Sequence, residues 1–228
     1  MKRKLCFVID VILFGSIWGF LEATLGTLLH LPIVDKAGMY AASSTIMVPI
    51  AYYVMAMCYK KTGKLYSVPM MGIIASAIKL CVAFVIGFRP SVYNPAIYII
   101  VESLCMFGAL AIFRPKNVLS LKTLASVIVA NTVYQFAYLN INMWMGGTNI
   151  YASEKAWMKV GEFHLFTMNA VAILYVFASG AILYGIVKVL EAKHVEIKFD
   201  YKRIVYSPIT ASIVFTVAVA STIALAAI

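Results

Sequence analysis

Long apolar runs constrain this chain more than any other feature of its sequence. Seven stretches, each close to the ~20 residues that an α-helix needs to cross a bilayer, are separated by short polar connections. They lack the two-residue alternation of barrel strands, so they predict helices rather than a membrane β-barrel. The predicted spans cover residues 5–29, 40–58, 65–88, 94–113, 119–144, 162–189 and 205–228.

Composition excludes the soluble classes of protein. Apolar residues make up 63% of the chain and charged residues 12%, whereas a soluble domain has roughly 45–50% and 25%. A soluble enzyme, a disordered regulator and a disulfide scaffold are excluded, because no soluble surface could be built without large apolar patches. We therefore predict an all-α, polytopic membrane helical bundle of about seven transmembrane helices. It forms a single transmembrane domain over residues 1–228, with a six-helix core in 1–190 and an extra C-terminal helix in 205–228.

The net charge of +10 is explained by loop charge rather than by nucleic-acid binding. Basic residues gather in alternate connections, which is the orientation bias of membrane proteins. Fourteen lie on one side: Lys2, Arg3, Lys4, Lys60, Lys61, Lys64, Arg114, Lys116, Lys122, Lys188, Lys193, Lys198, Lys202 and Arg203. Four lie on the other, Lys36, Arg89, Lys155 and Lys159. The bias predicts a cell-membrane protein with a cytoplasmic N-terminus and an external C-terminus.

Ionisable side chains inside membrane helices are costly, and they commonly mark functional sites. Those within the predicted spans are Asp10, Glu22, Lys79 and Glu102. At 1.5 Å per residue, Glu22, Lys79 and Glu102 reach similar depths, at or outside the midplane, so they could meet at one level. Asp10 lies near the cytoplasmic end. The alternative to a ligand site is a structural ion pair that fixes helix order.

Uncharged polar residues also favour the outer half of the bundle. Together with the charged residues they predict a polar pocket that opens outward above an apolar floor. Three large aromatic residues near the predicted outer connection could close over that pocket, or could belong to the interfacial aromatic belt. The polar group comprises Asn131, Gln135, Asn140, Asn142, Thr167, Asn169, His30 and His164, and the aromatic group comprises Trp144, Tyr151 and Trp157.

The first span carries a narrow stripe of small residues that includes a carboxylate. Gly15, Gly19, Glu22 and Gly26 fall within about 60° of one another on a helix. Small residues at this spacing let another helix approach closely. The stripe predicts either packing within the bundle or a docking face for a separate membrane subunit.

Motifs for catalysis and cofactor binding are missing from the sequence. There is no P-loop, dinucleotide fingerprint or zinc-protease motif. The cysteines, Cys6, Cys58, Cys81 and Cys105, lack metal-ligand spacing and are interpreted as small core residues. We expect no catalytic residue, metal or cofactor. A membrane enzyme that uses Glu102 and His164 as acid and base is an alternative, but no sequence spacing supports it.

Two runs resemble sequences of the substrate-binding components of energy-coupling-factor vitamin transporters. They are Gly19-Phe-Leu-Glu22-Ala-Thr-Leu-Gly26 and the segment from Asn94-Pro95-Ala96 to Glu102. The size, the six-span core, the small-residue face and the outward pocket fit the same family, over about the first 190 residues. Residues 205–228 would be a span beyond the family's usual six.

The resemblance implies a protein that binds a vitamin or a precursor from outside the cell. It would then dock on a coupling membrane subunit that two cytoplasmic ATPases drive, with Gly15, Gly19 and Ala23 as candidate docking residues. The resulting hypothesis is a transport component in the lipid bilayer that binds a small polar solute. Its candidate binding residues are Glu22, Lys79, Glu102, Asn131, Gln135, Asn169, His164, Trp144 and Trp157. A scaffold subunit of a larger membrane complex is the alternative.

Overall fold

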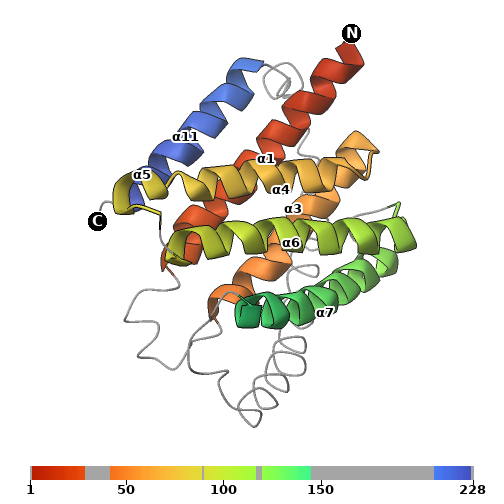
Figure 1. Cartoon of the computed structure of the whole chain (residues 1–228). Helices are drawn as coiled ribbons and strands as arrows, with labels where there is room; N and C mark the ends of the chain where they lie inside the picture. The colour runs from red at the N-terminus through yellow and green to blue at the C-terminus, as the bar shows by residue number, and fades with distance from the viewer. Residues whose placement is uncertain (1, 29–41, 89, 117–119, 145–207, 227–228) are drawn as a thin grey trace, which may run out of the picture.

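The computed structural model describes residues 2–28, 42–88, 90–116, 120–144 and 208–226, and this part of the chain is helical throughout, with turns between the helices (Figure 1). The predicted sixth span, residues 162–189, lies outside the described residues. The helices are α1 (Lys2–Leu28), α3 (Ala42–Thr62), α4 (Ser67–Leu80), α5 (Ala83–Ile86), α6 (Pro90–Phe113), α7 (Leu121–Trp144) and α11 (Pro208–Ala226).

Three helical stretches are long and apolar enough to cross a membrane. They are Leu5–Leu25, Ser67–Val85 and Tyr93–Phe113, and a shorter apolar helix covers Pro208–Ala224. The outer faces of the helices are apolar as well. Phe84 is 85% exposed and Leu121 is 83% exposed. Surfaces of this kind suit lipid, where the helix satisfies its own backbone hydrogen bonds. For the described residues, the prediction of a helical protein with helices apolar enough to span a membrane is therefore confirmed.

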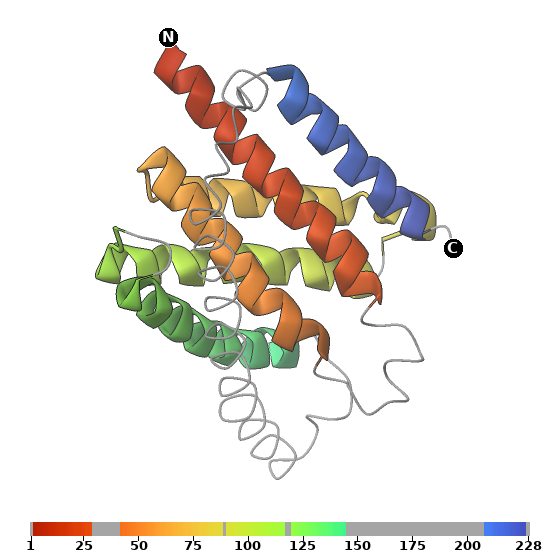
Figure 2. The same cartoon turned by 180° about the vertical axis from the view of Figure 1, so that it is seen from behind.

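The helices are arranged with alternating direction. α1 and α11 lie side by side and run the same way, whereas α4 and α6 are antiparallel neighbours (Figures 1 and 2). One end of the bundle holds the start of α1, the α3–α4 turn and the α6–α7 connection (Figure 1). Side chains tie two of these segments together: the Lys64 Nζ lies 5.0 Å from the centroid of the Phe7 ring, and the Phe7 and Tyr66 ring centroids are 5.1 Å apart.

The small residues of α1 pack against α4 within this chain. A Cβ atom at Gly15 would lie 2.8 Å from the Ile74 Cβ and 3.0 Å from the Met71 carbonyl oxygen. At Gly19 it would lie 2.8 Å from the Ile78 Cδ1. Ala23, the third candidate docking residue, is also buried. Of the two alternatives for this stripe, the structure shows packing within the bundle.

A second close contact joins α4 to α6. A Cβ atom at Gly72 would collide with the Ser103 side chain. One turn further along, the Ser76 hydroxyl donates a hydrogen bond of 2.9 Å to the Ala96 carbonyl oxygen on α6. Small and hydroxylated residues at helix crossings allow such close approach in membranes. The contacts place α4 between α1 and α6.

Two helices differ in detail from the predicted spans. α6 begins at Pro90, four residues before the predicted start at residue 94, so Pro95 lies inside the helix. Proline suits the first helical position because it has no N–H to satisfy, and Pro90 takes that position. The predicted span 65–88 is also not one continuous α-helix. After Leu80 the hydrogen bonds tighten to the three-residue pattern, from the Cys81 N–H to the Ile78 carbonyl and from the Val82 N–H to the Lys79 carbonyl.

We predict that Gly15→Ala lowers the free energy of unfolding by about 1–3 kcal/mol, because the added methyl group meets the Met71 backbone and the Ile74 side chain. Gly108→Ala on α6 is the matched control, since a Cβ there has no neighbour within 4 Å. It should raise stability by about 0.5–1 kcal/mol through helix propensity. Denaturant titration in mixed micelles measures both. Equal effects at the two positions would contradict the α1–α4 contact.

Candidate functional site: a buried polar cluster

Glu22 on α1 and Lys79 on α4 meet where the two helices pack together. The Lys79 Nζ donates a hydrogen bond of 3.4 Å to the main-chain carbonyl oxygen of Glu22. The Glu22 carboxylate accepts a bond of 3.3 Å from the Trp18 indole N–H and lies in electrostatic range of Lys79. Trp18 is fully buried four residues before Glu22, on the same helix face. The close approach of α1 and α4 therefore brings an acid and a base together.

Of the two carboxyl groups, Glu22 and Glu102, the one on α6, Glu102, is the more deeply buried. It is 4% exposed, and its Oε1 atom has no hydrogen-bond partner among the residues that the structure describes. Its carboxyl interacts electrostatically with that of Glu22. The three ionisable residues that the depth estimate placed at one level are thus brought together from α1, α4 and α6. A buried polar atom without a partner costs roughly 1–3 kcal/mol, and more when it is charged.

Two tyrosine side chains interact electrostatically with the Glu102 carboxyl. Tyr52 on α3 and Tyr134 on α7 both lie in its electrostatic range. Tyr52 is completely buried, and within the described part of the chain its hydroxyl has no hydrogen-bond partner. The Tyr134 and Tyr138 ring centroids are 6.2 Å apart, and the Tyr138 and Tyr98 centroids are 4.6 Å apart. Tyr98, Tyr138 and Tyr134 therefore form a continuous group of rings. Tyr98 precedes Glu102 by one helical turn, so the two residues lie on the same side of α6.

Asn131 and Gln135 lie on the buried face of α7. They are 2% and 3% exposed, and the Gln135 Nε2 donates to the Asn131 Oδ1 at 3.4 Å. Tyr134 lies between them in sequence and on the same buried side. We name the set formed by Trp18, Glu22, Tyr52, Lys79, Tyr98, Glu102, Asn131, Tyr134, Gln135 and Tyr138 the polar cluster.

The remaining predicted binding residues cannot be placed in this cluster. Trp144 is the last residue of α7. Trp157, His164 and Asn169 lie outside the described residues.

The tyrosines and Trp18 are the cluster members that sequence reasoning missed. Trp18 and Tyr98 each stand one helical turn before a carboxyl residue, and Tyr134 stands between two predicted polar residues. That spacing is a signal that could have found them. Tyr52 has no such signal, because its neighbours in sequence are apolar or aromatic and its position depends on how α3 packs.

The described residues hold no group of three or more potential metal ligands. The interpretation of the cysteines as core residues holds for Cys58, which is buried, but is wrong for Cys6, which is exposed near the start of α1. In a membrane helix an apolar side chain is equally stable against lipid, so an apolar run does not separate core positions from lipid-facing ones.

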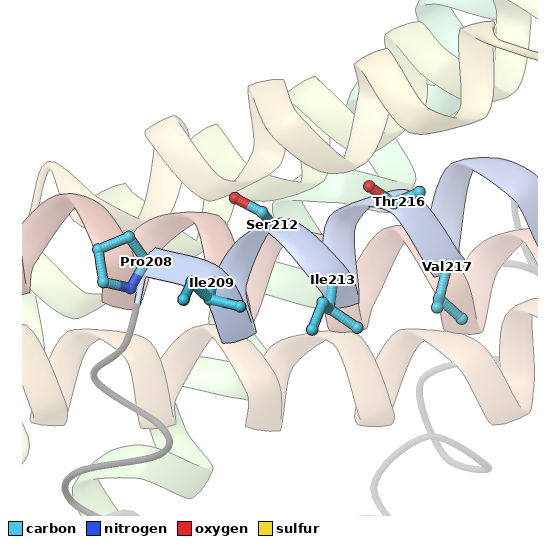
Figure 3. Close-up of a pocket in the computed structure, with 6 residues that line it drawn as sticks. All are labelled: Pro208, Ile209, Ser212, Ile213, Thr216 and Val217. Carbon is cyan, nitrogen blue, oxygen red and sulfur yellow. The ribbon is translucent and has the colours of Figure 1, made fainter.

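A pocket of about 450 Å³ lies elsewhere, along α11 (Figure 3). Its lining is Pro208, Ile209, Ser212, Ile213, Thr216 and Val217. These residues share one exposed face of the helix, and none of them is ionisable. This surface offers no charge or convergent polar groups, so it is a poorer candidate for binding a polar solute than the polar cluster.

Comparison with family models, with curated proteins and with solved structures found no match for this chain.

We predict that Glu102→Met raises the free energy of unfolding by about 1–2 kcal/mol. The substitution removes an oxygen without a partner and the repulsion from Glu22, at similar side-chain volume. Thermal and denaturant unfolding of the ligand-free protein in micelles measure the effect. Glu22→Met should have the opposite effect, because it removes the acceptor of the Trp18 hydrogen bond. A loss of stability in Glu102→Met would show that its carboxyl is a structural partner.

Proposed function

We propose that this chain is the solute-binding component of a membrane transporter and that the polar cluster binds a small polar solute. The observation that carries the proposal is the Glu102 carboxyl, which is buried and has an oxygen that no group among the described residues satisfies. Structural polar groups in membranes find partners, and ionisable groups without them mark solute or ion pathways. The unpartnered Tyr52 hydroxyl in electrostatic range of that carboxyl supplies a second group that a solute could satisfy.

The depth of the cluster supports access from the outer side. Glu22 lies six residues before the end of α1, and Lys79 lies one residue before the end of α4. Those helix ends are opposite the end that holds the α3–α4 turn (Figure 1). Glu102 is near the middle of α6. The cluster therefore extends from near the predicted outer surface toward the midplane, and Trp144 and Trp157 stay candidates for closing it.

The proposed topology is seven transmembrane helices with a cytoplasmic N-terminus. Its support is the distribution of basic residues over the segments that share one end of the bundle (Figure 1). These are the start of α1, the α3–α4 turn and the α6–α7 connection, with Lys2, Arg3, Lys4, Lys60, Lys61, Lys64, Arg114, Lys116 and Lys122. Excess positive charge is typical of the cytoplasmic side.

The sequence has no nucleotide-binding motif, which is consistent with a transport component that depends on partner subunits for energy. The resemblance to energy-coupling-factor components suggests a coupling membrane subunit with cytoplasmic ATPases. Since α4 covers Gly15 and Gly19, such a subunit would contact another face of the bundle. The scaffold alternative loses its main support for the same reason, because it relied on that stripe being free.

We predict that the protein purified from its native membrane carries a bound small molecule, detectable by mass spectrometry of the extract. Glu102→Gln should reduce that occupancy at least about tenfold, because a neutral amide cannot replace the carboxylate. Asp10→Asn is the matched control: it removes the same charge from a buried position near the cytoplasmic end, in electrostatic range of Lys61 instead. The Asp10→Asn variant should carry the bound molecule at the same occupancy as the parent chain. An extract without any specific small molecule, or equal occupancy in Glu102→Gln, would contradict the proposal.

Topology can be tested by cysteine labelling in a variant whose four native cysteines are replaced by alanine. We predict that Lys64→Cys in the α3–α4 turn stays unlabelled by an impermeant maleimide in intact cells and reacts after permeabilisation. Phe88→Cys, 77% exposed between α5 and α6, should react without permeabilisation. Labelling on the opposite sides would reverse the proposed orientation.

A further inference from the structure

We propose that the solute of the polar cluster is a small organic cation, a protonated amine or a quaternary ammonium, whose positive charge sits between the Glu102 carboxylate and the rings of Tyr52 and Tyr134. This inference rests on the proposed function and adds the chemical class of the solute.

The charge balance of the cluster points to a cation. Two carboxyl groups, Glu22 and Glu102, share the cluster with one ammonium group, Lys79. Lys79 donates to the Glu22 main chain, and the Glu22 carboxylate also has the Trp18 N–H. Among the described residues, no group donates a hydrogen bond to the Glu102 Oε1 atom. When Glu102 is ionised, one positive charge beside it would balance the cluster, because a buried carboxylate is stable only when paired and hydrogen-bonded.

The aromatic groups around the carboxyl favour an organic cation. Tyr52 and Tyr134 approach Glu102 from two different helices, α3 and α7, and Tyr98 stands one turn away on α6. Faces of aromatic rings attract ammonium groups, most strongly where water is excluded. An anionic solute would meet two carboxyl groups, and an uncharged solute would leave the Glu102 charge without compensation. Carboxylate and tyrosine rings together therefore select for positive charge on an apolar frame.

The test is calorimetric titration of the full chain in lipid nanodiscs. The probes are choline and ethanolammonium. Each is compared with a matched uncharged alcohol in which a carbon atom replaces the charged nitrogen. We expect each cation to bind at least about tenfold more tightly than its uncharged counterpart. Acetate should not bind. If the uncharged alcohols bind as tightly as the cations, the inference is overturned. A Glu102 carboxyl that carries a proton would give this result, because it would have no charge with which to prefer the cations.

Substitutions distinguish the contribution of the Glu102 charge to cation binding from the contribution of the tyrosine rings. Glu102→Gln should weaken choline binding at least about tenfold, whereas Asp10→Asn should leave it unchanged. Tyr134→Leu should weaken it several-fold, and Tyr134→Phe, which keeps the ring and the fold, should bind choline nearly as well as the parent chain. Tyr66→Leu, an aromatic residue at the α3–α4 turn, is the control for loss of a ring. Choline binding unchanged in Glu102→Gln overturns the inference.

The inference and the proposed function fail in different ways. The mass spectrum of the purified protein could show a neutral or anionic molecule that is absent from Glu102→Gln. That result would overturn the inference of a cationic solute and would support the solute-binding function. If the purified protein carries no solute and neither cation binds, both fail. A cation in the extract and cation-selective titration support both.

Discussion

The close approach of α1 to α4 determines where the charged groups of this protein can lie. Gly15 and Gly19 leave room for the Met71 backbone and the Ile78 side chain, so the two helices touch along the turns that precede Glu22 and Lys79. Without hydrophobic driving force inside lipid, such contacts rely on van der Waals packing at short range. A second contact of the same kind, between Gly72 and Ser103, places α6 against α4 and brings Glu102 into the group.

Much of this arrangement follows from the sequence by simple geometry. The length of the apolar runs predicts the helices, and a rise of 1.5 Å per residue is enough to place Glu22, Lys79 and Glu102 at similar depth. The buried positions of Asn131 and Gln135 also follow, because two amides in one membrane span favour its interior face.

Other features could not be predicted because they depend on partners distant in sequence. Tyr52 joins the cluster only through the way α3 crosses its neighbours, and its own sequence neighbourhood is apolar. The end of α4 at Leu80 could not be predicted either, because no glycine or proline follows it directly in the sequence. The start of α6 was also not marked: Pro90 starts the helix a turn before residue 94, and a proline near a helix start does not say which turn is first. Local patterns predict elements well, but side-chain partners depend on packing.

When all three groups are ionised, the two carboxylates and one ammonium group of the cluster keep one net negative charge in any arrangement of these three side chains. If Lys79 moved from Glu22 to Glu102, Glu22 would become the carboxylate without a cation. The Trp18 N–H can stabilise that charge but cannot cancel it. Replacing such groups by apolar side chains of similar volume is commonly neutral or stabilising, so packing alone gives no reason to keep both acids. An additional positive charge, brought from outside the chain, completes the balance in either arrangement, and the tyrosine rings beside Glu102 provide a place where an organic cation would be held.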